Sequence, residues 1–274
     1  MSPVGRLAPT PSGDLHLGNA LAFGAAWLAV RREGGRLLLR IEDLDRGRSR
    51  PAIAERQRED LHWLGIDWDE EVAAQSTRTY PLDGLPVYRC GCSRKKRLAG
   101  ECACRVDSPA EGVWRFACPP EPVTFVDALR GPHTLPPGRD PIVRRRDGEA
   151  AYPLAVVLDD HRDGVTQVVR GADLIPATPV QIRIAEALGI PRPRYQHVPV
   201  LLGPDGRKLS KSHQSTELRA LRDAGWTPER VWAALMPCLG LPPKPLWDIS
   251  KREWTEKKTP KGPFTFGEDG RRMA

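Results

Sequence analysis

The hydrophobic pattern between residues 4 and 45 predicts a strand, a helix and a second strand. Val4 to Leu7 is a short apolar run, and apolar side chains then recur at helical spacing from residue 20 to residue 33. We expect Asn19 to cap this helix and Gly34-Gly35 to end it. Arg36 to Ile41 has the apolar character of a buried strand. Together they predict a βαβ unit, whose ligands bind beyond the carboxyl ends of its parallel strands.

Further elements follow along the chain. Their predicted ranges are a helix at Glu55 to Leu64, strands at Ile142 to Arg146, Ala151 to Leu158 and Thr166 to Arg170, a helix from Thr178 (the cap) to Gly189, and helices at Thr216 to Ala224 and from Thr227 (the cap) to Met236. The whole predicts an α/β protein with a parallel sheet, a small cysteine-rich insertion and a short C-terminal helical region. We expect boundaries at residues 1–85 and 119–212 for the two halves of the main domain, 86–118 for the insertion, 213–242 for the helical region, and 243–274 for a basic irregular tail.

Composition narrows the class of protein. Hydrophobic residues make up 40% and charged residues 28%, which is typical of a globular chain. No stretch approaches the roughly 20 apolar residues of a membrane span, and the N-terminus lacks the apolar core of a signal peptide, so we expect a cytoplasmic protein. A net charge of +7 favours a polyanionic partner such as nucleic acid. Six cysteines in a cytosolic chain indicate metal ligands or buried thiols.

Two short motifs have the chemistry of a nucleotide site. The loop from Pro9 to Asn19 leads into a helix start, where backbone amides favour an anion. Lys208 to Ser212 follows a Gly-Pro-Asp-Gly turn, and its ammonium groups can close over a polyphosphate. We therefore expect an ATP-activating site with catalytic residues His16, Gly18, Asn19, Lys208 and Lys211, and with Ser210 as a further ATP-binding residue.

These motifs resemble the HIGH and KMSKS signatures of class I aminoacyl-tRNA synthetases, here His16-Leu17-Gly18-Asn19 and KLSKS. Further runs resemble the catalytic domain of the glutamyl/glutaminyl-tRNA synthetase group: Arg6 to Gly13, Arg40 to Asp45, Asp159-Asp160-His161 and Val169 to Leu174. The resemblance spans about residues 4 to 240 and implies a Rossmann-type catalytic domain. It implies that ATP is a substrate, with Mg²⁺, and that tRNA is the partner. We expect the protein to be a monomer. The resemblance also implies that glutamate is bound by Arg6, Leu7, Ala8, Pro9, Thr10, Glu42, Tyr152 and Arg170. Two arginines and one acid match the two carboxylates and one ammonium of glutamate.

The chain ends at residue 274, whereas a full glutamyl-tRNA synthetase has an anticodon-binding helical region after KMSKS. We expect that region to be missing. A chain with this architecture that lacks the anticodon-binding region resembles the glutamyl-queuosine tRNA(Asp) synthetases. Members of that family activate glutamate and transfer it to the queuosine base of tRNA(Asp). The alternatives are a truncated glutamyl-tRNA synthetase charging a tRNA 3′ end, a nucleotidyltransferase of the same superfold, and a non-catalytic RNA-binding zinc module.

The cysteine segment predicts a metal site. Cys90, Cys92, Cys102 and Cys104 form two C-x-C pairs whose four thiolates suit one structural Zn²⁺ per chain. The family resemblance implies a tyrosine in place of one cysteine, and we infer that Cys102 replaces it. Cys118 is the rival for the fourth position, and Cys238 is expected in the core.

Overall fold

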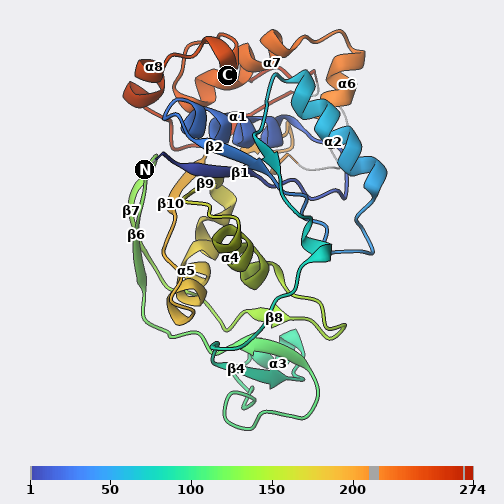
Figure 1. Ribbon diagram of the computed structural model, residues 1–274, viewed down its shortest axis with the longest axis vertical. Coiled ribbons are helices and arrows are strands. Elements are labelled where there is room, and N and C mark those ends of the chain that lie inside the picture. The colour runs from blue at the N-terminus through green and yellow to red at the C-terminus, as the bar shows by residue number, and fades with distance from the viewer. Residues whose placement is uncertain (1, 210–215, 268, 274) are drawn as a thin grey trace.

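A parallel sheet and a mixed sheet meet in the middle of the molecule, and a cysteine-containing lobe forms one end of it (Figure 1). The computed structural model describes residues 2–209, 216–267 and 269–273. The helices are α1 (Leu17–Arg31), α2 (Pro51–Trp63), α3 (Arg94–Leu98), α4 (Tyr152–Arg162), α5 (Thr178–Ala187), α6 (Leu218–Asp223), α7 (Pro228–Leu235) and α8 (Lys251–Glu256). The strands are β1 (Val4–Leu7), β2 (Arg36–Leu39), β3 (Glu70–Glu71), β4 (Val87–Cys90), β5 (Val113–Phe116), β6 (Val123–Asp127), β7 (Gly131–Leu135), β8 (Ile142–Arg144), β9 (Gln167–Gly171), β10 (Arg194–Val198), β11 (Leu201–Leu202) and β12 (Phe264–Thr265).

The expected βαβ unit is confirmed, because β1 and β2 pair in parallel with α1 between them in the chain. One sheet has the order β1-β2-β3 and the other β7-β6-β10-β9. They meet where the Thr166 amide, just before β9, donates to the Val4 carbonyl at 2.9 Å. Gly5 of β1 makes close packing possible there, since a Cβ at this position would lie 2.5 Å from Val30 of α1. The carboxyl ends of β1 and β9 therefore lie side by side, at the kind of switch point where α/β proteins bind ligands.

The C-terminal part of the chain covers α1. Trp232 of α7 is fully buried against Gly24 of α1, and its indole donates to the Leu64 carbonyl at 2.9 Å. The segment after residue 243, which we expected to be an irregular tail, also packs here: it contains α8 and β12, and Trp254 and Phe266 belong to the main hydrophobic core. Its short elements have weak sequence periodicity because tertiary packing, and not local pattern, stabilises them.

Several element predictions need correction. Ala151 to Leu158 is helix α4 and not a strand, with Pro153 in the first helical turn. Short apolar runs fit either element, which explains the error. His16, and not Asn19, is the N-cap of α1, and Thr178 is the first residue of α5 and not its cap. The cap at Thr227 is confirmed. Within the described residues no helix is both long and apolar enough to cross a membrane.

The cysteine lobe is built from an antiparallel sheet of β4, β5 and β8 together with α3, at the lower end of the view in Figure 1. No residue of α3 is buried. Leu98 and Val106 expose 59% and 88% of their surface, so this lobe has little apolar core of its own.

Candidate active site

A cavity of about 490 Å³ opens beyond the carboxyl ends of β1 and β9. The strand ends, the start of α1 and the hairpin after β11 all contribute to its lining. The predicted site residues that line it are Arg6, Ala8, Pro9, Thr10, His16, Gly18, Asn19, Glu42, Tyr152, Arg170 and Lys208. The structure thus brings together both motifs and the amino-acid residues, although Arg6 and Lys208 are about 200 positions apart in the chain.

One predicted residue lies away from the cavity, and two others are not described by the structure. Leu7 is fully buried in the core and does not line the cavity, because side chains alternate along β1 and Arg6 and Ala8 take the cavity side. Ser210 and Lys211 lie outside the described residues, so their roles stay predictions.

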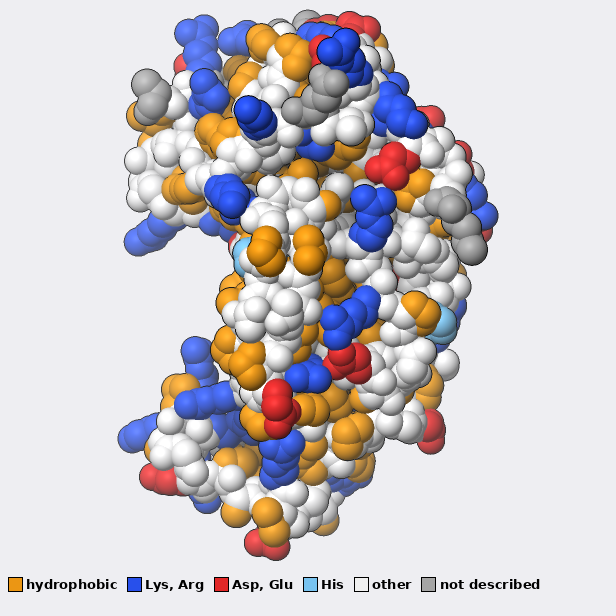
Figure 2. Space-filling model, turned by 90° about the vertical axis from the view of Figure 1, so that its left-hand side faces the viewer, with side chains coloured by type: hydrophobic (Ala, Val, Ile, Leu, Met, Phe, Trp, Pro, Cys, Tyr) orange, Lys and Arg blue, Asp and Glu red, His pale blue; other side chains and the backbone are white. Residues whose placement is uncertain are grey.

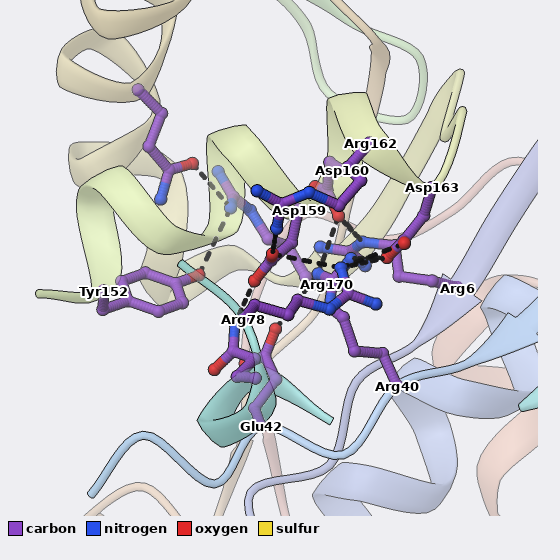
Figure 3. Close-up of polar contacts among 12 residues, drawn as sticks. Arg6, Arg40, Glu42, Arg78, Tyr152, Asp159, Asp160, Arg162, Asp163 and Arg170 are labelled. Atoms are coloured by element: carbon purple, nitrogen blue, oxygen red, sulfur yellow. Dashed lines mark hydrogen bonds and ion pairs between the residues drawn. The ribbon is translucent and has the colours of Figure 1, made fainter. Parts of the chain in front are cut away.

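A buried ion-pair network fixes one arginine of the cavity (Figure 3). Asp160 of α4 lies between Arg6, whose Nε is 3.2 Å away, and the fully buried Arg40, whose Nη2 is 2.7 Å away. Arg40 also contacts Asp163 at 2.9 Å and Glu42 at 3.2 Å. Burial alone would raise the pKa of Asp160, but the guanidinium groups of Arg6 and Arg40 outweigh it and hold that pKa below its usual value. Asp160 is therefore ionised and orients Arg6.

Glu42 is the acid of the cavity. Burial raises the pKa of Glu42 above its usual value, and Arg40 and Arg6 offset this only in part. Its Oε1 lies 3.2 Å from Arg40, so the carboxylate is held at the cavity wall, where a cationic ligand would favour its charged form.

Arg170 is held in a different way from Arg6. Its guanidinium donates to His197 Nε2 at 3.1 Å, and to Thr178, Gln181 and Tyr152 at 2.9, 2.8 and 3.5 Å, all of them neutral partners. Across the part of the chain that the structure describes, no carboxylate forms an ion pair with it, and only 6% of its surface is exposed. A buried cation without an anionic partner is costly, so the cavity presents a seat for a carboxylate here.

The other side of the cavity has the groups expected for a nucleotide. His16 Nδ1 accepts from the Gly18 amide at 3.0 Å while the Asn19 side chain accepts from the His16 amide at 3.1 Å, which fixes the first turn of α1. A Cβ at position 18 would lie 2.9 Å from the His16 ring, so glycine is required for this arrangement. Lys208 extends from the hairpin after β11 and forms an ion pair with Asp173, with over half of its side chain exposed.

Sequence reasoning missed the residues that support the cavity. Asp160 belongs to a run that carried the family resemblance, yet it received no role, and His197 and Thr178 were not singled out as supports of Arg170. One signal was present: two adjacent aspartates in an apolar segment are rarely buried without partners.

The four cysteines of the expected metal site converge. The Sγ atoms of Cys90, Cys92, Cys102 and Cys104 all lie within 4.8 Å of one another, with Cys90 to Cys102 at 3.7 Å and Cys92 to Cys104 at 3.5 Å. A tetrahedral Zn–S site with bonds of about 2.3 Å has S to S edges of about 3.8 Å, so the cluster fits a metal ion. Cys118, the rival, is buried outside the cluster, and Cys238 lies in the main core as expected.

Comparison with known proteins agrees with this geometry. Residues 4–87 and 91–261 match the family described as tRNA synthetases class I (E and Q), catalytic domain. The chain belongs to this class I synthetase family. Its resemblance to the queuosine-related branch is also confirmed by proteins named glutamyl-Q tRNA(Asp) synthetase. That of Symbiobacterium thermophilum is 42% identical over 284 residues, with 88% of each chain covered, and that of Nocardia farcinica is 39% identical over 297 residues, with 97% of this chain and 94% of the relative covered.

Solved class I synthetases share the fold of this chain. A glutamate tRNA ligase from Elizabethkingia meningosepticum in complex with its amino acid superposes with a TM-score of 0.71 at 22% identity. The glutamate-tRNA synthetase from Elizabethkingia anophelis superposes with a TM-score of 0.73 at 22% identity. The present chain is covered completely and spans 66% and 68% of those proteins. The expected catalytic-domain fold of a class I synthetase is therefore confirmed.

Proposed function

We propose that the protein activates L-glutamate with ATP and transfers the glutamyl group to tRNA, with the queuosine base of tRNA(Asp) as the acceptor. The observation that carries this proposal is the contrast between Arg170, a buried cation without an ion-pair partner among the described residues, and Glu42, a largely buried acid that lines the same cavity. An α-amino dicarboxylate matches this set: one carboxylate for Arg170, another for Arg6 beside its ion pair with Asp160, and an ammonium for Glu42 beside its ion pair with Arg40.

In this mechanism the chain supplies positioning and positive charge. Arg6 and Arg170 hold the amino acid so that a carboxylate oxygen of glutamate attacks the α-phosphorus of ATP and pyrophosphate leaves. The start of α1 at His16 and Gly18 binds the nucleotide, and Lys208 stabilises the negative charge that develops on the departing phosphates. Lys208 must leave Asp173 to do so.

The tRNA acceptor is supported by the surface. Figure 2 shows a hollow side of the molecule with lysines and arginines on both the upper and the lower lobe. On the cysteine lobe, Arg94, Lys95 and Lys96 of α3 are exposed and have no acidic partner among the residues described. Unpaired cations on an exposed helix favour contact with phosphates of a nucleic acid. We further propose that the four-cysteine cluster holds one structural Zn²⁺, which shapes this lobe.

ATP–pyrophosphate exchange with Mg²⁺ and no tRNA tests the activation step. Exchange should require glutamate, aspartate should be a poor substrate because its shorter side chain cannot reach both arginines, and Arg170→Ala should lose most activity. Arg194→Ala, an exposed arginine at the start of β10, is the matched control. Exchange without glutamate would indicate a nucleotidyltransferase instead.

Labelled glutamate then tests the transfer step. We expect labelling of tRNA(Asp) that contains queuosine, and labelling should persist after periodate oxidation of the tRNA 3′ end. A signal that disappears on periodate treatment would instead assign the protein as a truncated glutamyl-tRNA synthetase.

A further inference from the structure

His197 lies next to Arg170 across two parallel strands. The two residues are register partners on β10 and β9, and both side chains are buried. Arg170 Nε donates to His197 Nε2 at 3.1 Å, and Thr178 Oγ1 lies 3.3 Å from the same nitrogen. His197 itself does not line the cavity, so it reaches a ligand only through Arg170.

The protonation of His197 follows from its neighbours. An arginine nitrogen is always a donor, so His197 Nε2 must carry a lone pair. The proton of a neutral ring is then on Nδ1, which lies 2.7 Å from Asp127 Oδ2. Asp127 of β6 is itself fully buried and accepts the backbone amides of Leu129, Arg130 and His197 at 2.9 to 3.0 Å. This carboxylate cannot turn away, and the tautomer of His197 is thereby fixed.

We propose that His197, held by Asp127 as the Nδ1–H tautomer, is a positioning residue that orients Arg170 for the substrate carboxylate without neutralising its charge. A carboxylate in place of His197 would orient the guanidinium equally well but would cancel the charge that the substrate needs. A neutral acceptor such as His197 orients the guanidinium and leaves its positive charge available to the substrate. The inference rests on the proposed role of Arg170 in glutamate binding.

The groups around His197 favour its neutral form. Asp127 faces it from β6, Arg130 from the loop after β6, Arg170 from β9 and Thr178 from α5. Burial lowers the pKa of His197, and the positive charges of Arg170 and Arg130 lower it further. The hydrogen bond to Asp127 raises the pKa but does not outweigh them. The ring is therefore neutral at neutral pH. Protonation at acid pH would remove the acceptor for Arg170, so the KM for glutamate should rise there.

Steady-state exchange kinetics test the positioning role. His197→Phe keeps a ring but removes the acceptor, so KM for glutamate should rise about tenfold to a hundredfold, while kcat and the KM for ATP change less than about twofold. His197→Gln should recover part of the affinity, because its amide oxygen can accept from Arg170. Tyr195→Phe, two positions earlier on β10 and with its ring stacked on His197, is the control and should leave KM unchanged. A folded His197→Phe protein with unchanged KM for glutamate would overturn the proposal.

A spectroscopic measurement tests the tautomer independently of any activity. The chain has six histidines, and the resonance of His197 is assigned by its loss in His197→Gln. Nitrogen-15 NMR of the wild-type protein at pH 7 should show Nδ1 protonated and Nε2 unprotonated for this ring. An Nε2–H ring or an imidazolium would refute the inference even if glutamate is the substrate. Conversely, absence of glutamate-dependent exchange in the wild type refutes the proposed function, whatever the tautomer.

Discussion

The cavity and the cysteine lobe keep polar groups together in opposite ways. Around the cavity, Arg40 is fully buried and holds three carboxylates within a large apolar core. In the cysteine lobe, α3 has no buried residue, Val106 is almost fully exposed, and four thiols lie within 4.8 Å of one another. Where much apolar surface is buried, ion pairs can be excluded from water, and each charged side chain then orients its partners. Where it is scarce, a small unit needs a cross-link such as a metal ion.

Removal of metal should produce the largest effect. Purified protein should contain about one zinc per chain, and chelation should unfold the cysteine lobe, because structural zinc contributes roughly 10 kcal/mol to small metal sites at neutral pH. Hydrogen exchange should increase over residues 87–118 while α1 and β1 stay protected. Exchange of ATP with pyrophosphate should continue, and transfer to tRNA should fall.

A pair of cysteine variants sharpens this test. Cys102→Ser should lower the zinc content, whereas Cys118→Ser, which alters a buried thiol outside the cluster, should not. Full zinc loading of Cys102→Ser together with loss in Cys118→Ser would reverse our choice of ligand. If the protein contained no metal and still transferred glutamate to tRNA normally, the cysteine lobe would not depend on a metal cross-link, and the proposed contrast with the cavity would be wrong.

Disruption of the buried ion pairs should come next in size. Arg40→Ala leaves Asp160, Asp163 and Glu42 without their shared cation, which should lower the free energy of unfolding by about 3–5 kcal/mol in urea titrations at pH 7.5. Arg36→Ala at the start of β2, where the ion pair with Glu70 is exposed, should cost less than about 1 kcal/mol. Equal losses in the two variants would show that burial does not govern the strength of these ion pairs.

A smaller effect should arise at Asp60, a carboxylate of α2 with only 1% of its surface exposed. Burial raises the pKa of Asp60 to about 6, although Arg219, 3.6 Å away, lowers it in part. The folded state then holds this proton more strongly than the unfolded state, so the contribution of Asp60 to the free energy of unfolding should fall as pH rises from about 4 to 6. After allowance for solvent screening we expect a fall of about 2 kcal/mol.

Asp60→Asn should flatten this part of the pH profile, and Glu59→Gln, its exposed neighbour, should leave the profile as in the wild type. Thermal unfolding between pH 4 and pH 7 measures both. Identical pH profiles for the wild type and Asp60→Asn would contradict the raised pKa of Asp60.

The smallest effect on stability should accompany the exposed pair of Lys208 and Asp173. Lys208→Ala should change the free energy of unfolding by less than about 1 kcal/mol, yet it should lower kcat for exchange by about a hundredfold, because its charge acts on the departing phosphates. Asp173→Asn removes the same ion pair but keeps the ammonium group, so it should retain most of kcat. Equal losses of kcat in the two variants would assign the effect to the pair itself.

The sequence was sufficient for the parallel βαβ unit and for part of the cavity lining, because strand and helix periods place Arg6, His16 and Glu42 at the ends of identifiable elements. Tyr152 and Arg170 were predicted from the family resemblance and not from any local pattern. It was insufficient for α4, where consecutive valines and leucines fit a strand or a helix equally well and only the packing of the fold decides. The pairing of Arg40 with Asp160 was also out of reach, since the two residues are 120 positions apart and no local pattern specifies long-range ion pairs.

The pairing of β12 with β11 has a practical consequence for anyone who alters this chain. Leu201 and Leu202 of β11 align in parallel with Phe264 and Thr265 of β12, and β11 leads directly into the turn before Lys208. A deletion that trims the chain at residue 242 to obtain a minimal catalytic fragment would therefore strip the nucleotide-side hairpin of its neighbouring strand. Purification tags and fusion partners are better attached at the opposite end, or separated from Phe266 by a long spacer.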